Sequence, residues 1–416
     1  MSSKLYSLES TTTIQVELTA NCNAMCPACD RWVRDTDNKD KTLKVGDLNP
    51  TIKPYQGSKG HFTWEAWQNL FNPTTMKNLR MVTYNGTWGD SILHPDIFKF
   101  TQHLIDTLKE VGNDRCGLEI ATNGGLHDPY WWKQMAELTK QFHQPWTKVI
   151  FAIDGLDDKT HQMYRRAVSW PKLMENAKAY LSVGGRAVWQ WLQFDHNKHQ
   201  TLDAKQMASD LGFAEFWLRG SRGERLTIQD SIKELGKKDT TNDDKNVQLY
   251  QSKSVDKRVK YDEAKQGSIK YITDTSKVQQ ELKDVKAKYK NYKDYQENTS
   301  ISCIWGNKGK INVEFNGLVH PCCFLNHYMN NFWSKNIDSS LDGGEYELMT
   351  DGYDSNWNNL NYNPLQDILA HKFYRNDLEE SWSRSTTDLT LPKLSVCVEH
   401  CGEGHGNIAS YDVEKL

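Results

Sequence analysis

The chain has no run of about eighteen apolar residues, so its sequence predicts no membrane-spanning helix. Its first ten residues lack the apolar core of a secretory signal, and we therefore expect a cytoplasmic protein. A strong charge of one sign is also missing. The formal net charge of the 416 residues is −3, which argues against a protein that binds nucleic acid. There is no internal repeat, and the only biased tract is a Lys-rich stretch in the second half.

Nine cysteines are present, and their grouping is informative. In the cytoplasm thiols stay reduced, so cysteines there indicate metal binding or catalysis rather than disulfides. Seven of the nine fall into three groups: Cys22, Cys26 and Cys29; Cys322 and Cys323; Cys397 and Cys401. Cys116 and Cys303 stand alone. Metal ligation requires thiols in groups of this kind.

The first cysteine group follows Thr13–Leu18, whose alternating apolar residues predict a strand. Cys22, Cys26 and Cys29 have the spacing C-x3-C-x2-C. Three such thiolates can hold three corners of a cubane iron–sulfur cluster and leave the fourth iron open for chemistry. A zinc knuckle or a disulfide framework is the alternative. Zinc, however, usually takes four ligands in paired short spacings, and no His is close to these cysteines in the sequence.

Strand-like and helix-like segments alternate from Ile14 to about Arg222. The predicted strands are Ile14–Leu18, Met81–Tyr84, Leu118–Ala121, Val149–Ile153, Ala187–Phe194 and Phe216–Arg219. The predicted helices are Thr63–Phe71, Pro95–Val111, Tyr130–Phe142, one within Leu156–Val183, and Gln200–Leu211. This alternation predicts an α/β fold with a parallel sheet, which is either an open doubly wound sheet or a six-stranded partial barrel.

Polar and glycine-rich motifs follow the second, third and fourth predicted strands. They are Gly-Thr-Trp-Gly-Asp at 86–90, Ala-Thr-Asn-Gly-Gly at 121–125, and Ala-Ile-Asp-Gly at 152–155 with Tyr-Arg-Arg at 164–166. Glycine lets a ligand approach the backbone, and polar side chains at the ends of barrel strands are placed for ligand contact. Each motif also has a simpler explanation: a tight turn, a helix cap at Asp90, or a surface arginine at Arg165.

The cysteine spacing and these motifs, in this order, resemble the radical S-adenosylmethionine (radical SAM) enzymes. The resemblance implies that the chain from 13 to 222 forms a partial (β/α)6 TIM-like barrel. It also implies that S-adenosylmethionine chelates the open iron through its amino and carboxylate groups. Reductive cleavage of that molecule then yields a 5′-deoxyadenosyl radical.

The same resemblance implies contacts to S-adenosylmethionine from Gly86, Trp88, Gly89 and Asp90, from Thr122 and Asn123, and from Asp154 and Arg165. The ends of the fifth and sixth predicted strands add candidates by their position: Gln193, His196 and Asn197 are placed for ligand contact, and Arg219 and Arg222 could clamp a carboxylate. Arg165 is expected to approach either the cofactor carboxylate or a structural carboxylate, and Asn197 is equally suited to cap a helix. Most family members carry an aromatic residue before the third cysteine. Here Ala28 stands at that position, so Trp32 or Trp88 would have to cover the adenine.

A second cysteine module begins at Cys303. Ile311–His320 predicts a β-hairpin that turns at Asn316-Gly317 and brings Cys303 close to Cys322. The spacing C-x13-G-x4-C resembles the opening of the SPASM and twitch extensions of radical SAM enzymes. The resemblance therefore implies a C-terminal α+β module with an auxiliary cluster.

Cys397 and Cys401 are four residues apart, which suits one helical face or a tight loop. With Cys303 and Cys322 they would close one auxiliary [4Fe-4S] cluster, which matches the twitch form better than the seven-cysteine SPASM form. Cys323 competes with Cys322, and the Gly-x4-Cys spacing favours Cys322. Four thiolates also suit structural zinc, which stays an alternative here.

The sequence thus predicts four regions: an N-terminal extension (1–12), the barrel (13–222), a polar Lys-rich bridge or insertion (223–300) and the cysteine-rich module (301–416). By resemblance, the chain is expected to be a radical SAM oxidoreductase with two [4Fe-4S] clusters. Its partners would be a small-molecule or peptide substrate and a flavodoxin- or ferredoxin-like electron donor. A peptide-modifying maturase is one alternative, and a non-catalytic iron–sulfur or zinc module is a more remote one.

Overall fold

The computed structural model describes residues 5–27, 29, 31, 55–194, 196–220, 275–329, 344–404 and 412–415. Three residues with an expected role, Ala28, Trp32 and Arg222, lie outside these ranges. Most of the long polar stretch between Asp30 and His61, and the expected bridge up to residue 274, lie outside as well. Within the described part of the chain, no helix has the length and apolar character needed to cross a bilayer.

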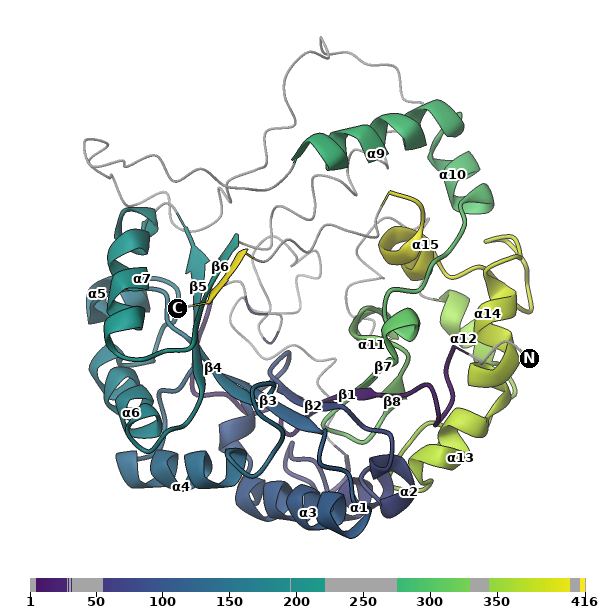
Figure 1. Ribbon diagram of the computed structural model, residues 1–416. Coiled ribbons are helices and arrows are strands. Elements are labelled where there is room, and N and C mark those ends of the chain that lie inside the picture. The colour runs from purple at the N-terminus through teal and green to yellow at the C-terminus, as the bar shows by residue number, and fades with distance from the viewer. Residues whose placement is uncertain are drawn as a thin grey trace.

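One nine-stranded sheet, with the strand order β8-β7-β1-β2-β3-β4-β5-β6-β9, forms the centre of the molecule (Figure 1). Its six central strands are parallel: β1 (Thr13–Glu17), β2 (Met81–Asn85), β3 (Gly117–Thr122), β4 (Lys148–Ala152), β5 (Ala187–Gln193) and β6 (Glu215–Gly220). The terminal strands β8 and β9 do not pair with each other, so the barrel is open. The predicted partial (β/α)6 barrel is confirmed, and each predicted strand agrees to within one residue.

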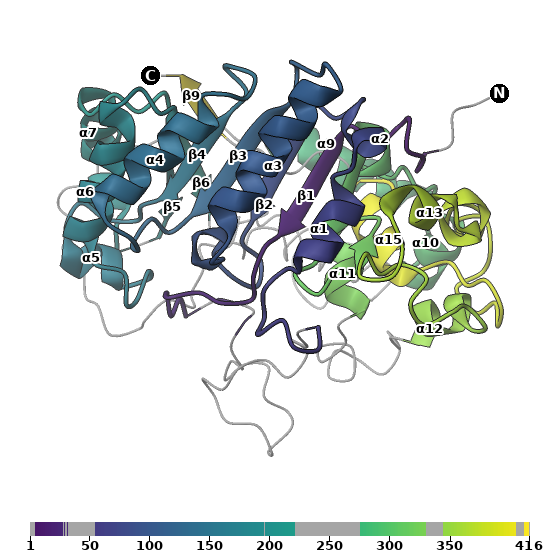
Figure 2. The same ribbon diagram turned by 90° about the horizontal axis from the view of Figure 1, so that it is seen from below.

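Helices cover the convex side of this sheet, as Figure 2 shows from below for α1, α3 and α4. The main ones are α1 (Trp64–Leu70), α3 (Ile97–Glu110), α4 (Pro129–Thr139), α6 (Trp170–Ser182) and α7 (Thr201–Asp210). Shorter elements complete this layer: α2 (Pro73–Met76), η1 (Ser91–Leu93), α5 (Asp158–Gln162) and η2 (Lys198–Gln200). Side-chain caps explain where two of these helices begin. Thr63 caps α1 by accepting from the backbone N of Ala66, and Asp128 caps α4 by accepting from the backbone N of Trp131.

The main hydrophobic core lies between the sheet and these helices. In β1, Ile14 and Val16 are fully buried in it. From α1, Trp67 stacks on Phe100 of α3 with ring centroids 4.4 Å apart. Side chains alternate along a strand, so Gln15 and Glu17 point to the concave side of the sheet. The barrel therefore presents polar residues to its interior.

The single helix expected within Leu156–Val183 is in fact two, α5 and α6. Ala167, between them, has a φ of 63°, which no continuous right-handed helix permits. Pro171 then lies in the first turn of α6, where its missing N–H costs nothing.

The C-terminal module is mostly helical around a short hairpin. Its elements are α9 (Thr275–Lys288), α10 (Tyr292–Asn298), η4 (Gly306–Lys308), β7 (Lys310–Val313), β8 (Val319–His320), α11 (Cys323–Met329), α12 (Gly344–Thr350), α13 (Leu365–Ala370), the π-helical turn η5 (Phe373–Asp377), α14 (Leu378–Ser381), α15 (Ser395–Cys401) and β9 (Asp412–Lys415). The predicted hairpin is confirmed, and Gly317 at its turn has a φ of 93° that favours glycine.

The hairpin is attached directly to the barrel. β7 pairs in parallel with β1 in the register Ile14↔Ile311, so the module extends the barrel sheet. At the other edge, β9 pairs antiparallel with β6. The sequence predicted neither pairing.

The last part of the expected bridge packs on the C-terminal module. Val285, Tyr289 and Tyr295 form a small buried cluster with Val398 of α15. The hydroxyl of Tyr295 also donates to the backbone O of Glu403 at 2.8 Å. Residues 275–300 are therefore structurally part of the module that carries Cys397 and Cys401.

Candidate active site

The first cysteine group lies in the loop that follows β1, at the carboxyl ends of the parallel strands. Cys26 is buried, and Cys22 and Cys29 are half-buried. The segment turns tightly, since the backbone N of Cys29 donates to the backbone O of Cys26 at 3.1 Å. The Sγ of Cys22 accepts from the backbone N of Ala24 at 3.4 Å. Sulfurs that accept backbone N–H bonds are typical of iron–sulfur ligands.

The cysteine thiols are near enough to influence one another. Burial and the charge of Asp90 raise the pKa of Cys22 to about 12, and Cys26 adds to this. Burial likewise raises the pKa of Cys26, while Arg165 works in the opposite direction. Without metal these thiols hold their protons at neutral pH, so ligation here must release protons.

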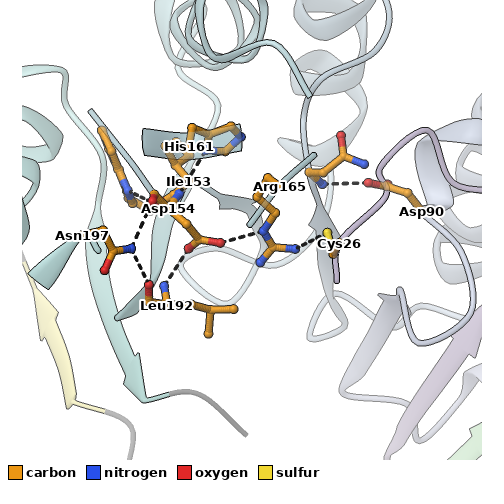
Figure 3. A network of polar contacts seen from close by, with 10 residues as sticks. Cys26, Asp90, Ile153, Asp154, His161, Arg165, Leu192 and Asn197 are labelled. Carbon is orange, nitrogen blue, oxygen red and sulfur yellow. Dashed lines mark hydrogen bonds and ion pairs between the residues drawn. The ribbon is translucent and has the colours of Figure 1, made fainter. Parts of the chain in front are cut away.

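Arg165 connects the end of β4 to the cysteine segment (Figure 3). Its Nε donates to Oδ2 of Asp154 at 2.7 Å, and its Nη1 lies 3.9 Å from the Sγ of Cys26. Asp154 is fully buried, so this ion pair is shielded from water. Asp154 is thus a structural carboxylate partner of the kind expected for Arg165.

Asp154 is itself fixed by β5 and by the loop that follows β5. Its Oδ1 accepts from the backbone N of Leu192 at 2.7 Å. Asn197 donates through Nδ2 to the backbone O of both Asp154 and Leu192, at 3.0 and 2.8 Å. The Oδ1 of Asn197 accepts from the backbone N of Phe194 at 2.7 Å. Asn197 therefore holds the backbone of Asp154, Leu192 and Phe194 together.

Asp90 ties together the loops that follow β2 and β3. Its Oδ2 accepts from Oγ1 of Thr122 at 3.0 Å and from the backbone N of Asn123 at 2.7 Å. Burial raises the pKa of Asp90, and these hydrogen bonds oppose the shift. The backbone N of Asp90 donates to the backbone O of Asn21, next to Cys22, at 2.8 Å. The loop after β2 thus rests on the cysteine segment.

Gly89 and Asn123 complete these contacts. A Cβ on Gly89 would lie 2.1 Å from the backbone O of Thr19, so only glycine fits there. Asn123 donates through Nδ2 to Oδ1 of Asn23 at 2.8 Å, and the same atom lies 3.7 Å from the Sγ of Cys22. The loops after β2, β3 and β4 all converge on the three cysteines.

Other candidate residues lie outside this network. Gln193 is buried and donates to Oγ1 of Thr201 at 2.9 Å. His196 stacks on Phe194, and the guanidinium of Arg219 lies 5.1 Å from the ring centre of Trp217. Trp88 is 2% exposed and points into the protein, so the adenine contact suggested for its ring has no open face here.

The four cysteines of the second module lie around one pocket. Cys303, Cys322, Cys397 and Cys401 all line one largely apolar pocket. Cys397 and Cys401 reach it from the same helix, α15, whereas Cys323 does not line it. Cys116 lies far away in sequence and space, where its Sγ is near the backbone O of Gly117 at the start of β3.

Tyr6 is a site residue that sequence reasoning missed. Its hydroxyl lies 3.0 Å from the Sγ of Cys303 and 3.3 Å from the backbone O of Pro321. Contacts from the Cys401 thiol and from Tyr6, together with the backbone N of Gly306 at 3.4 Å, lower the pKa of Cys303 to about 6. The predicted N-terminal extension therefore helps to build the second cysteine site, although no motif in 1–12 indicated it.

The donors at both sites are cysteine sulfurs, the ligand type of iron–sulfur clusters. Among the described residues, no three or more His, Cys, Asp or Glu side chains form a group that could hold one metal ion. Backbone N–H groups at 3.4 Å also approach the sulfurs of Cys22, Cys303 and Cys322.

We expect a Tyr6→Phe substitution to lower the reduction potential of a cluster bound at the second site. Hydrogen-bond donors stabilise the reduced, more negative form, and losing one bond of about 1 kcal/mol corresponds to about 40 mV for one electron. Potentiometric EPR titration measures the shift. Tyr374→Phe is the control, because that buried hydroxyl donates to the backbone O of Val319 rather than to sulfur. Equal potentials in both variants would contradict this role of Tyr6.

Known proteins resemble this chain only distantly. No protein-family model matches the sequence, and no curated protein does. The solved structure of anSMEcpe with bound AdoMet is 10% identical with a TM-score of 0.47, covering 96% of this chain and 88% of that one. Streptococcus suis SuiB bound to the precursor peptide SuiA is 14% identical with a TM-score of 0.41, covering 93% of this chain and 76% of that one. Such values are too low to assign a function, which has to come from the site.

The site and the fold agree on one class. In its cysteine spacing, in the order of its later motifs and in its partial barrel, the chain resembles radical SAM enzymes.

Proposed function

We propose that this chain is a radical SAM enzyme with Cys22, Cys26 and Cys29 as the ligands of its catalytic [4Fe-4S] cluster. The observation that carries the proposal is the convergence of Asp90, Asn123 and Arg165 on this segment. Bound there, the cluster would supply the electron that cleaves S-adenosylmethionine to methionine and a 5′-deoxyadenosyl radical, which abstracts hydrogen from the substrate.

The protein's own residues have distinct tasks in this proposal. Arg165 lies beside Cys26 and offsets the negative charge that thiolate ligands bring into a buried site. Asp154 holds Arg165 in place, and Asn197 and Leu192 hold Asp154. Asp90 fixes the Gly-x-x-Gly-Asp loop, so that the backbone of Gly86 and Gly89 can receive the methionine part of the ligand.

The remaining predicted contacts to S-adenosylmethionine stay part of the proposal. They are Thr122, Asn123, Gln193, His196 and Arg219, whereas Trp88, with its ring buried, is kept only as part of the loop that lines the methionine groove. Thr122 donates to Asp90, and Asn123 donates to Asp90 and to Asn23. In this proposal both residues mainly hold the loops in position. Direct ligand contact would use the groups that remain.

The second site is proposed to hold an auxiliary [4Fe-4S] cluster on Cys303, Cys322, Cys397 and Cys401. Four thiolates leave no open position, so this site would pass electrons or anchor substrate. An oxidoreductase that removes hydrogen from a small molecule or a peptide would use it to accept the second electron. The electron donor is proposed to be a flavodoxin- or ferredoxin-like protein.

The direct test uses the full chain, reconstituted anaerobically with iron and sulfide. With dithionite and S-adenosylmethionine, we expect 5′-deoxyadenosine and methionine in equal amounts, measured by liquid chromatography and mass spectrometry. Omitting dithionite is the control, because cleavage needs an electron. A protein that loads iron but forms no 5′-deoxyadenosine would instead be a non-catalytic iron–sulfur module.

A further inference from the structure

Two buried carboxyl groups flank Trp88 where the barrel meets the C-terminal module. The backbone N of Trp88 donates to Oε2 of Glu17 at 3.0 Å. Its indole Nε1 donates to Oε1 of Glu314 at 3.1 Å. The side chain of Glu17 is fully buried and that of Glu314 is 1% exposed. One tryptophan thus bonds to two acidic residues that are almost three hundred positions apart.

These residues come from three parts of the fold. Glu17 ends β1, five residues before Cys22, and Trp88 lies in the loop after β2. Glu314 directly follows β7, and the Nε2 of His320 in β8 lies 3.6 Å from its Oε2. Ile311 and Val313 face the main core, so alternation places Glu314, like Glu17, on the concave side of the sheet. The three residues meet where β1 and β7 run side by side.

Packing alone does not account for this arrangement. Burying a carboxyl group is costly unless hydrogen bonds compensate for the lost water. Burial and the nearby Glu314 raise the pKa of Glu17 to about 8, although hydrogen bonds from the backbone N of Trp88 and from the side chains of Thr87 and Asn85 oppose the shift. Apolar side chains at these positions would cost less free energy to bury. The hydrogen bonds from Trp88 to Glu17 and Glu314 therefore point to a role beyond packing.

The loop that receives these bonds is intrinsically loose. It runs from Gly86 to Asp90 and contains two glycines, so its backbone has few restraints of its own. Asp90 holds its far end, and Trp88 holds its middle. The ring of Trp88 also packs with Ala20 and Phe315, one residue from the cysteine loop and one from the hairpin turn. Without Trp88 the middle of the loop would lose its anchor to both neighbours.

We propose that Glu17, Trp88 and Glu314 form a link through which the C-terminal module holds the S-adenosylmethionine loop in its binding conformation. Trp88 is then a positioning residue, and Glu314 is the residue through which the module acts. This inference rests on the proposed function, because it assigns the loop 86–90 to S-adenosylmethionine. The link makes ligand binding in the barrel depend on a module that contributes no ligand to the catalytic cluster.

A double-mutant cycle tests the link. Trp88→Phe removes the indole donor, Glu314→Leu removes its acceptor, and the double variant removes both. Each single variant should weaken S-adenosylmethionine binding to the reconstituted protein about tenfold, as expected for one lost buried hydrogen bond. The double variant should be no weaker than either single one, because both act through the same bond. Equilibrium dialysis measures the affinities, and iron content should stay at the wild-type level.

A second measurement does not depend on any cofactor. In the metal-free protein, amide hydrogen exchange in residues 86–90 should accelerate about tenfold in both single variants, because the loop opens more often. Glu314→Gln keeps an oxygen acceptor and should restore slow exchange. Trp217→Phe is the matched control, since it also removes an indole bond to a carboxylate, that of Glu215 at 2.8 Å, at the far side of the barrel.

The outcomes are distinguishable. Exchange in 86–90 that is equal in Trp88→Phe, Glu314→Leu and Trp217→Phe would overturn the link, and so would additive losses in the double variant. Wild-type protein that binds no S-adenosylmethionine would overturn the proposed function instead. In that case the exchange data alone decide whether Trp88 anchors the loop to the module.

Discussion

A Cys26→Ala protein should form no 5′-deoxyadenosine from S-adenosylmethionine and dithionite. In the proposed function only three thiolates hold the catalytic cluster, so losing one would leave two ligands and an unstable site. If both clusters are present in the wild type, iron should fall from about eight to about four atoms per chain, because each cubane carries four. Cys26 is also the buried member of the group and the one next to Arg165, so no nearby thiol can replace it.

Cys116→Ala is the matched control for this experiment. It also removes a buried thiol, but at the start of β3 and away from both cysteine groups. It should keep full iron content and full cleavage, with at most a modest loss of stability from the small cavity. Undiminished 5′-deoxyadenosine formation by the Cys26→Ala protein would contradict the assignment of the catalytic cluster.

The second large effect is expected from Cys401→Ala. This thiol lines the pocket with Cys303, Cys322 and Cys397, so its loss should remove the auxiliary cluster or leave it labile. Reductive cleavage of S-adenosylmethionine should largely survive, because the catalytic cluster has its own three ligands. Turnover of the physiological substrate should fall by at least tenfold, since the electron acceptor or the fold of the module is damaged. Iron analysis and EPR spectra, together with the cleavage assay, separate the two clusters.

Cys323→Ala provides the control, because Cys323 neighbours Cys322 but does not line the pocket. We expect it to keep both clusters. A Cys323→Ala protein that loses the auxiliary cluster while Cys322→Ala retains it would reverse the assignment of these two residues. If Cys401→Ala removed cleavage as well, the two sites would not be independent.

Local patterns predicted much of the barrel because its strands follow simple rules. Ile14 and Val16 alternate with polar residues, since one side of β1 packs on helices and the other faces the interior. The spacing of Cys22, Cys26 and Cys29 predicted a metal-binding loop, and the turn at Gly317 predicted the hairpin. Each of these patterns spans only a few residues, and backbone conformation over so short a segment depends mainly on the residues next to it in the sequence.

Other features depended on contacts between distant segments. Nothing local in Glu17 or Glu314 indicates burial, because acidic residues are usually exposed and only the pairing of β1 with β7 brings these two together. Tyr6 carries no motif, yet its hydroxyl reaches Cys303. Arg165 carried no sequence signal for a particular structural carboxylate, and Asp154, which follows β4, is the one that it contacts.

The sequence by itself therefore determined the strand pattern and the cysteine groups, because periodicity and ligand spacing are local properties. Only the tertiary structure decided how the C-terminal module joins the barrel, since β7 pairs with β1 across almost three hundred residues. It also decided that Asp90, Thr122 and Asn123 hold one another in place. The physical reason is that buried polar groups take whichever partners the packed chain brings within hydrogen-bond distance, and sequence spacing does not contain that distance.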